Sequence, residues 1–217
     1  MTMPIWQTEQ KLIDYPTALS AMESHVEGLL AGKAPEKIWL LEHPPLYTAG
    51  TSARAEELLN ARFPVYDAGR GGRYTYHGPG QRVAYVMIDL KRRGCDVRAY
   101  IDHLEAWVQT ALASFGIQAA KREGRVGLWV NDKGHDQKIA AIGVRIRRWV
   151  TWHGVAVNVN PDLSHFGGIV PCGLADYGVT SMHALGVPVT LAQFDQALQK
   201  HWQDDFARVP ALRLKTA

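Results

Sequence analysis

Apolar residues recur at helical spacing in three stretches of the chain. The first follows an Asp-Tyr-Pro sequence at residues 14–16, which is typical of a helix start with a capping residue and a proline in the first turn. The second runs from Val97 to Phe115 and is closed by Gly116. The third covers residues 191–206 and follows Thr190, which together with Gln193 resembles a capping box. The pattern predicts three amphipathic helices.

Strand-like patterns separate these helices. Short apolar runs occupy residues 37–42, 83–90 and 124–130, and apolar residues alternate with other residues in 142–147 and 155–159. The sequence NDKGH at 131–135 has the composition of a tight turn, which predicts a hairpin there. We expect the two alternating segments to pair as antiparallel neighbours. With no repeat or linker in the sequence, residues 1–217 are interpreted as one α+β domain.

Two segments rich in glycine and proline interrupt this pattern, RGGRYTYHGPGQ at 70–81 and the stretch 161–182. The first is a poor helix or central strand, because glycine costs backbone entropy and proline lacks an amide donor. A strand follows it directly, so the loop is expected to be held in place and to line a binding site. Its glycine amides are expected to donate to a substrate, and three of its side chains to contact one: Arg70, Thr75 and His77.

Composition narrows the function classes. The chain has 217 residues, of which 47% are hydrophobic and 21% charged, and a formal net charge of +3. This charge is too small to indicate nucleic-acid binding, although it suits acidic protein partners. No apolar run reaches the length that spans a bilayer, and the first residues lack the pattern of a signal peptide, so we expect a cytoplasmic protein. No cysteine or histidine spacing indicates a metal site.

Candidate chemistry rests on a few side chains. Cys172 lies in the second glycine-rich segment directly after a proline, a setting that exposes a thiol, but a lone cysteine is more often a small buried hydrophobe. Cys95 has no comparable setting. Lys138 opens an apolar strand, where a lysine usually extends to water. His77 and His153 are each as consistent with a structural as with a catalytic histidine. The residues by themselves indicate a soluble enzyme with a cysteine as its candidate nucleophile.

The glycine stretch closely resembles the signature of the lipoyl(octanoyl) transferases, the octanoyl-[acyl-carrier-protein]:protein N-octanoyltransferases. Every fixed position of that pattern is matched in RGGRYTYHGPGQ. Two further segments resemble the family's lysine strand with its hairpin, QKIAAIGVRIRRWVTWHGVAVNV, and its cysteine loop, IVPCGL. Ala141 and Val155 are mild departures, since serine and leucine are frequent at these positions. The resemblance runs from about residue 37 to residue 182.

The resemblance implies a fold, an activity and a site. The fold is that of the biotin/lipoate protein ligase catalytic domain, with mixed, largely antiparallel sheets flanked by helices. The activity is transfer of an octanoyl group from octanoyl-acyl carrier protein, through a cysteine thioester, to the lysine amine of lipoyl domains. Cys172 is implied as the nucleophile and Lys138 as the acid/base, with His153 in support. The implied substrate-binding residues are Arg70, Gly71, Gly72, Arg73, Tyr74, Thr75, Tyr76, His77, Ala141, Ile142, Gly143, Gly154, Val155 and Ala156.

The chemistry suits these residue types. Exchange of one thioester for another keeps the acyl group activated, so the reaction needs no cofactor and no ATP. We expect amides of the two glycine-rich segments to stabilise the oxyanion. The implied acceptors are lipoyl domains of 2-oxoacid dehydrogenases and the glycine cleavage H protein, and a monomer without membrane or nucleic-acid partners is expected. Two alternatives stay open: an ATP-dependent lipoate or biotin protein ligase, and a non-catalytic acyl-binding module.

Overall fold

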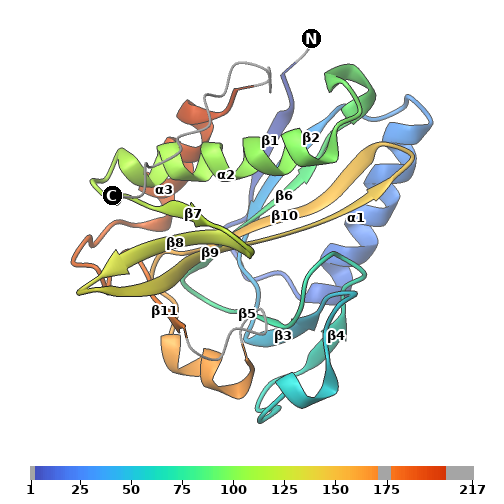
Figure 1. The fold of residues 1–217 in the computed structure, drawn as a ribbon. Helices are drawn as coiled ribbons and strands as arrows, with labels where there is room; N and C mark the ends of the chain where they lie inside the picture. Colours follow the sequence, from blue (N-terminus) through green and yellow to red (C-terminus); the bar gives the residue numbers. More distant parts are fainter. Residues whose placement is uncertain (1–2, 171–176, 204–217) are drawn as a thin grey trace.

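The computed structural model describes residues 3–170 and 177–203. Within these residues, seven strands of the larger sheet follow the order β1-β2-β6-β10-β9-β8-β7, and β11 pairs with β9 (Figure 1). Their bounds are β1 Ile5–Thr8, β2 Lys37–Leu41, β6 Gln81–Met87, β7 Ala120–Arg122, β8 Arg125–Asp132, β9 His135–Arg147, β10 Val150–Asn158 and β11 Gly178–Val179. The pairings are antiparallel except for β1 with β2 and β11 with β9, so the sheet is mixed and largely antiparallel.

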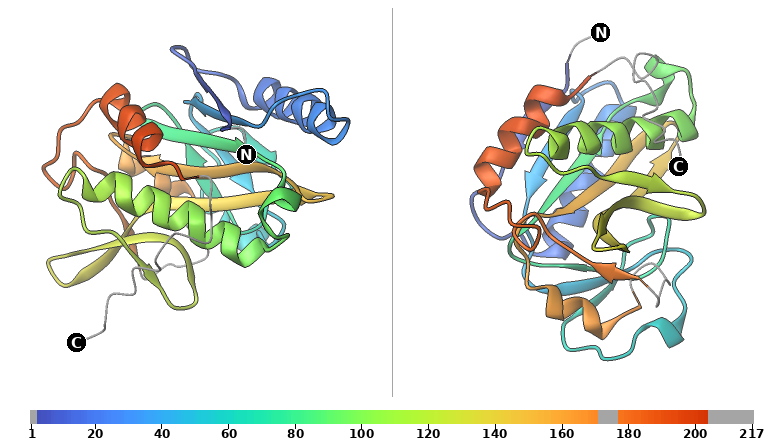
Figure 2. Two further views of the ribbon diagram at one scale, coloured as in Figure 1. Left: turned by 90° about the horizontal axis from the view of Figure 1, so that it is seen from above. Right: turned by 60° about the vertical axis from the view of Figure 1, so that its left-hand side comes forward.

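Helices cover both faces of this sheet (Figures 1 and 2). The period of two in a strand sends alternate side chains to opposite faces. In β2, Ile38 and Leu40 pack with α2 (Val97–Ala113) and α3 (Leu191–His201), whereas Trp39 and Leu41 pack with α1 (Tyr15–Leu30). The sheet therefore has an apolar core on each face, and its central strands are buried on both sides.

A smaller sheet lies beside the larger one and carries the glycine stretch. Its order is β4-β3-β5, formed by Val65–Asp67, Leu46–Ala49 and Thr75–His77. Short 3₁₀ helices, Ala55–Glu57 and Leu163–Gly168, accompany it. Figure 1 shows this sheet below the larger one, at the end where β5 leads into β6.

Most of the predicted elements are confirmed. Asp14 caps α1 by accepting from the amide of Thr17, and Thr190 and Gln193 form the predicted capping box of α3. The predicted turn joins β8 to β9, and β9 pairs antiparallel with β10. None of the described helices combines the length and the hydropathy that crossing a bilayer requires.

The prediction was incomplete in the smaller sheet. The sequence patterns indicated no strand between residues 42 and 83, yet β3 and β4 lie there. The glycine stretch was expected to be loop throughout, yet Thr75–His77 forms β5. Strands of three or four residues are too short to show a reliable period, and they exist because β3 supplies their hydrogen-bond partners. As an edge strand, β5 tolerates the glycine and proline that follow it.

Candidate active site

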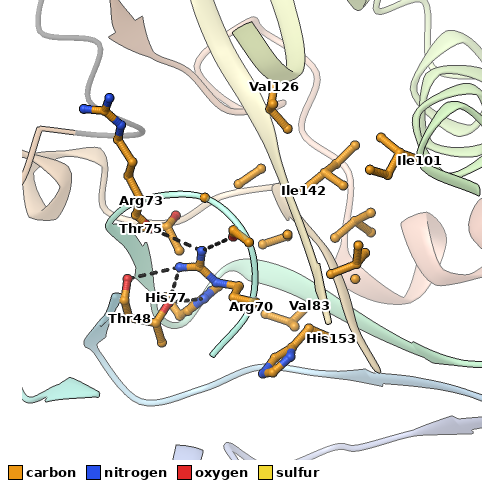
Figure 3. A pocket seen from close by; sticks show the side chains of 18 of the residues that line it. Thr48, Arg70, Arg73, Thr75, His77, Val83, Ile101, Val126, Ile142 and His153 are labelled. Carbon is orange, nitrogen blue, oxygen red and sulfur yellow. Dashed lines mark hydrogen bonds between the residues drawn. The ribbon is translucent and has the colours of Figure 1, made fainter. Parts of the chain in front are cut away.

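A cavity of about 560 Å³ lies between the glycine stretch, strands β6, β9 and β10, and the start of α2 (Figure 3). Its walls are largely apolar, with side chains of Val83, Ile101, Val126, Ile142 and Val144. The sequence-predicted residues that line it are Arg70, Gly71, Gly72, Arg73, Thr75, His77, Ala141, Ile142, Gly143, His153, Gly154, Val155 and Ala156. The tertiary structure thus brings together three segments that are far apart in the sequence.

Arg70 holds the glycine stretch in shape. Its guanidinium donates to the carbonyl oxygens of Gly71, Arg73 and Thr48 at 3.0, 3.1 and 3.0 Å, and to the Thr48 hydroxyl at 2.6 Å. Figure 3 shows these bonds converging on the buried side chain. Gly143 leaves room for it, since a Cβ there would lie 2.8 Å from Cδ of Arg70. Arg70 was predicted to contact substrate; it lines the cavity, and its guanidinium bonds to oxygen atoms of the protein.

Two of the glycine amides are already engaged. Gly71 donates to the carbonyl oxygen of Val144 at 3.0 Å, which docks the glycine stretch on β9. Gly80 donates to the Glu42 carboxylate at 2.7 Å. The expectation that the glycine amides are all available to a substrate is therefore wrong for these two, because the protein's own oxygens reach them first.

His77 is fixed in one tautomer. Nε2 of Gln81 donates to the carbonyl oxygen of Tyr76 and to Asn158, so Oε1 of Gln81 is the acceptor for Nδ1 of His77 at 2.7 Å. The Thr48 hydroxyl, which accepts from Arg70, lies 3.4 Å from Nε2 of His77. Desolvation on burial lowers the pKa of His77 well below its ordinary value, and the positive charge of Arg70 acts in the same direction. His77 therefore presents a neutral ring to the cavity.

Tyr15, Tyr85 and His153 form another part of the cavity wall, and the ring of His43 packs against both tyrosines. Nδ1 of His43 donates to the carbonyl oxygen of Ile13 at 2.6 Å, so its Nε2 accepts from the Tyr85 hydroxyl at 2.6 Å. The Tyr15 hydroxyl lies 3.2 Å from Nε2 of His153. Desolvation on burial lowers the pKa of His43 to about 4 and that of His153 to about 3.

Lys138 lies in a much smaller neighbouring cavity of about 10 Å³, whose lining also includes Thr75 and Ala141 from the larger one. The side chain is 5% exposed, and Nζ lies 5.4 Å from the centre of the Trp129 ring. The interpretation of Lys138 as a strand-end lysine that extends to water is wrong, because β9 begins three residues earlier and β8 and β11 flank it.

Three further predicted residues do not line the larger cavity or cannot be placed. Tyr76 is fully buried in an aromatic cluster, and its hydroxyl lies 2.8 Å from Nδ1 of His165. Tyr74 belongs to the same cluster. Cys172 lies outside the described residues, so its distance from Lys138 stays untested. Among the described residues, no group of three or more His, Cys, Asp or Glu side chains is arranged to hold a metal ion.

Sequence reasoning missed several residues of the cavity. Tyr15 comes from the first turn of α1 and Tyr85 from the middle of β6, while Ile101 and Val126 come from α2 and β8. From the sequence, each of these residues was either part of a helical or strand pattern or was not considered, and none was predicted to line a site. Nothing in local spacing distinguishes a core residue from one that faces a cavity, so only the tertiary packing identifies them.

Comparisons with known proteins identify the family of this chain. Residues 14–203 match the family model of the lipoyl protein ligase A/B catalytic domain. The octanoyltransferase of Sphingopyxis alaskensis is 59% identical over 92% of this chain and 93% of its own length. The octanoyltransferase of Maricaulis maris is 59% identical over 96% of this chain and 95% of its own length.

Solved structures show the same fold at low sequence identity. A bipartite lipoate protein ligase from Thermoplasma acidophilum superposes with a TM-score of 0.67 at 15% identity, covering 92% of this chain and 82% of that one. A lipoate-protein ligase A bound with ATP superposes with a TM-score of 0.66 at 17% sequence identity, covering 92% of this chain and 84% of that one. The cavity, the motifs and the identities lead to one conclusion: the chain belongs to the lipoyl protein ligase A/B catalytic domain family and is an acyltransferase of its octanoyltransferase branch.

Proposed function

We propose that this octanoyltransferase takes the octanoyl group from an acyl-carrier-protein thioester, holds it as a thioester on Cys172, and passes it to the lysine amine of a lipoyl domain. The acceptors are lipoyl domains of 2-oxoacid dehydrogenases and the glycine cleavage H protein. One observation supports this most: an apolar cavity large enough for a fatty acyl chain adjoins the small cavity that holds buried Lys138.

Two anchored segments flank Cys172. Before it, the amide of Val170 donates to the carbonyl oxygen of Glu57 at 2.8 Å. After it, Val179 is the strand partner of Lys138, and the amide of Thr180 donates to the carbonyl oxygen of Lys138 at 2.9 Å. Because the segment that follows Cys172 is anchored beside Lys138, it supports the proposal that Cys172 and Lys138 act together.

The proposed steps balance without a cofactor. The Cys172 sulfur attacks the thioester carbonyl, the bond to the carrier's sulfur breaks, and the carrier thiol takes the proton that Cys172 releases through Lys138. The amine of the acceptor lysine then attacks the enzyme thioester and forms an amide. The proton that the amine loses returns to the Cys172 sulfur, again through Lys138.

The apolar walls have a second role. They exclude water from the enzyme thioester, which would otherwise be hydrolysed. They also leave the chain's methylene groups in contact with Val83, Ile101 and Ile142, so that burial of the chain supplies binding free energy in proportion to the apolar area removed from water.

Mass spectrometry of the intact protein tests the nucleophile. We expect incubation with octanoyl carrier, without ATP, to add one octanoyl group to the wild type and to Cys95→Ala, but none to Cys172→Ala. Cys95 is the matched control because it is the other of the chain's two cysteines and lies outside the cavity lining. Labelling that requires ATP and free octanoate would instead identify a ligase.

A second experiment tests Lys138. Lys138→Arg keeps a cation but has no usable base, so single-turnover formation of the acyl-enzyme should slow by about 100-fold or more. Lys133→Arg, the same substitution at an exposed position in the turn between β8 and β9, serves as the matched control. Wild-type rates in Lys138→Arg would exclude the acid/base role.

A further inference from the structure

The turn between β9 and β10 has an unusual backbone for the residues that form it. β9 ends at Arg147, which pairs with Val150 at the start of β10. Arg148 and Trp149 form the turn between them, with φ angles of +50° and +72°. A two-residue hairpin turn with positive φ at both positions is of type I′, which prefers asparagine, aspartate and glycine. An arginine and a tryptophan strain this turn, and retained strain of this kind indicates a function.

Both side chains of the turn are exposed to solvent. Trp149 is 37% exposed and belongs to neither apolar core of the larger sheet. Arg148 is exposed and has no ion-pair partner within the described residues. Tryptophan and arginine are the residue types most enriched at the centres of protein interfaces. Because neither residue suits the turn and neither contributes to the core, binding to a partner is the role that their exposure favours.

Further cations lie beside the turn. The amide of Leu90 donates to the carbonyl oxygen of Trp149 at 2.8 Å, which holds the 3₁₀ helix Leu90–Arg93 against the turn, at the same end of the molecule (Figure 1). This helix presents Lys91 and Arg92 to solvent. We call the exposed residues of the helix and the hairpin end the basic rim: Lys91, Arg92, Arg147, Arg148 and Trp149.

Most of the positive charge of the basic rim is uncompensated. Arg147 lies 3.7 Å from Glu27 of α1, and Arg93, which is buried, pairs with Glu36 at 2.7 Å. No ion pair within the described residues involves the other three cations, Lys91, Arg92 and Arg148. The rim is therefore a small positive surface with an acidic residue at its border. Such a surface suits a compact acidic protein better than an extended polyanion, which would also cover Glu27.

The basic rim is close to the cavity but remote from the reacting atoms. On β9, Arg147 lies three residues beyond Val144, which lines the cavity, and nine residues beyond Lys138. These separations correspond to roughly 10 Å and 30 Å of strand. An acceptor domain seated on the rim could not reach Lys138, because its lysine side chain is short. An acyl carrier holds its thioester on a long flexible arm, so the carrier's body and arm together cover the distance.

We propose that the basic rim is the docking surface for the acidic carrier protein that donates the acyl group. Arg148 and Trp149 form its centre, and Lys91 and Arg92 add the charge that guides the carrier onto it. This inference rests on the proposed function, since it takes the carrier as the donor. It adds the place where the donor binds, and it implies that donor and acceptor use different surfaces.

A variant with a relaxed turn tests the proposal. Arg148→Asn combined with Trp149→Gly gives the turn the residues that type I′ prefers, so we expect this double variant to be at least as stable in urea as the wild type. Its kcat/KM for octanoyl carrier should nevertheless fall by about tenfold or more. With octanoyl pantetheine, which lacks the protein body, both proteins should react equally fast. An unchanged kcat/KM for the carrier, or an equal loss with both donors, would overturn the proposal.

Charge reversal provides a matched pair of variants. Arg148→Glu should lower kcat/KM for octanoyl carrier by about tenfold at low salt, and the loss should shrink as salt is added. Lys133→Glu makes the same charge change at an exposed position of the β8–β9 turn that has the same φ of +50°, and it should leave kcat/KM near the wild-type value. Equal losses in the two variants would refute a specific role of the rim.

Other occupants of the basic rim predict different results. Transfer from preformed acyl-enzyme to a lipoyl domain should be equally fast in the wild type and the double variant. Slowing of this step alone would assign the rim to the acceptor and contradict the proposal. Binding to phosphatidylglycerol vesicles that the double variant loses, together with unchanged use of the carrier, would assign the rim to a membrane surface and contradict it as well.

The docking surface and the proposed function fail separately. If the wild type takes no octanoyl group from the carrier, the proposed donor is wrong, and calorimetric titration with octanoyl carrier still decides the docking surface. Binding that is about tenfold weaker in the double variant than in the wild type supports it. Equal binding to both proteins, or binding to neither, contradicts it.

Discussion

Gly127 on β8 faces the side chain of Lys138 so closely that a Cβ on Gly127 would lie 2.6 Å from Cε of Lys138 and 3.1 Å from its Nζ. The same Cβ would lie 2.5 Å from the carbonyl oxygen of Ala140, and the φ of Gly127 is +104°. Trp129, two residues on, supports the ammonium group with its ring. β8 therefore positions the lysine that the proposed mechanism uses, and a glycine is what allows β9 and the lysine to lie this close.

Substitution of Gly127 by alanine should impair acyl transfer. The added methyl group displaces Lys138, so we expect acyl-enzyme formation to slow by at least about tenfold, in addition to a backbone strain of about 1–2 kcal/mol. Gly134→Ala separates the two effects, because Gly134 also has a positive φ, +86°, but no atom within 4 Å of its Cβ position. Equal single-turnover rates in the two variants would show that strain alone is responsible.

Arg70 should be irreplaceable by lysine. Its guanidinium reaches oxygen atoms of Thr48, Gly71 and Arg73, which a single ammonium group cannot bridge in the same way. Hydrogen bonds to charged groups contribute about 1.5–3 kcal/mol each, so we expect Arg70→Lys to lower the free energy of unfolding by about 3 kcal/mol. Urea denaturation measures this loss. Arg62→Lys, at an exposed position with one bond to the carbonyl oxygen of Ser164, should change it by less than about 0.5 kcal/mol.

A buried ion pair should hold α3 to the sheet. Nε of Arg82 lies 2.7 Å from one carboxylate oxygen of Asp195, and Nη2 donates to the other at 3.0 Å. Asp195→Asn leaves the buried Arg82 without its counter-charge, and the expected loss of unfolding free energy is about 3–5 kcal/mol. Asp102→Asn, which removes an exposed partner of Lys121, should cost about 0–1 kcal/mol. Similar midpoints of denaturation for both variants would contradict this ranking.

Buried histidines should make the protein acid-sensitive. Desolvation lowers the pKa of His43 to about 4 and that of His153 to about 3, both from an ordinary value of 6.5. Below about pH 6.5 the unfolded chain binds protons that the folded chain does not, so stability present above that pH is lost as the pH falls toward the folded-state pKa values. The loss is up to about 1.4 kcal/mol per pH unit for each histidine.

Denaturation at about pH 7.5 and about pH 5.5 measures this dependence. His43→Gln should make the unfolding free energy depend less steeply on pH. His135→Gln, at an exposed position of the β8–β9 hairpin, should leave the dependence as it is in the wild type. A wild type that is equally stable at both pH values would show that these histidines do not control acid stability.

Local patterns predicted much of this protein. Helix caps at Asp14 and Thr190 and the glycine-containing turn between β8 and β9 follow from backbone sterics and short-range hydrogen bonds, which a sequence displays directly. The glycine stretch and its resemblance to the octanoyltransferases predicted the family, because that signature is a contiguous pattern.

What only the tertiary structure decided is the surroundings of each side chain. From the sequence, Lys138 was interpreted as a strand-end lysine that extends to water, but β8 and β11 bury it. No sequence pattern assigned Tyr15 and Tyr85 to the site, and only tertiary packing places them beside His153. The small sheet also appeared only in three dimensions, since its short strands depend on partners supplied by distant segments. Sequence determines local conformation through nearest-neighbour sterics and periodicity, whereas burial and strand pairing join residues far apart in the chain, and these decide the shape and polarity of the cavity.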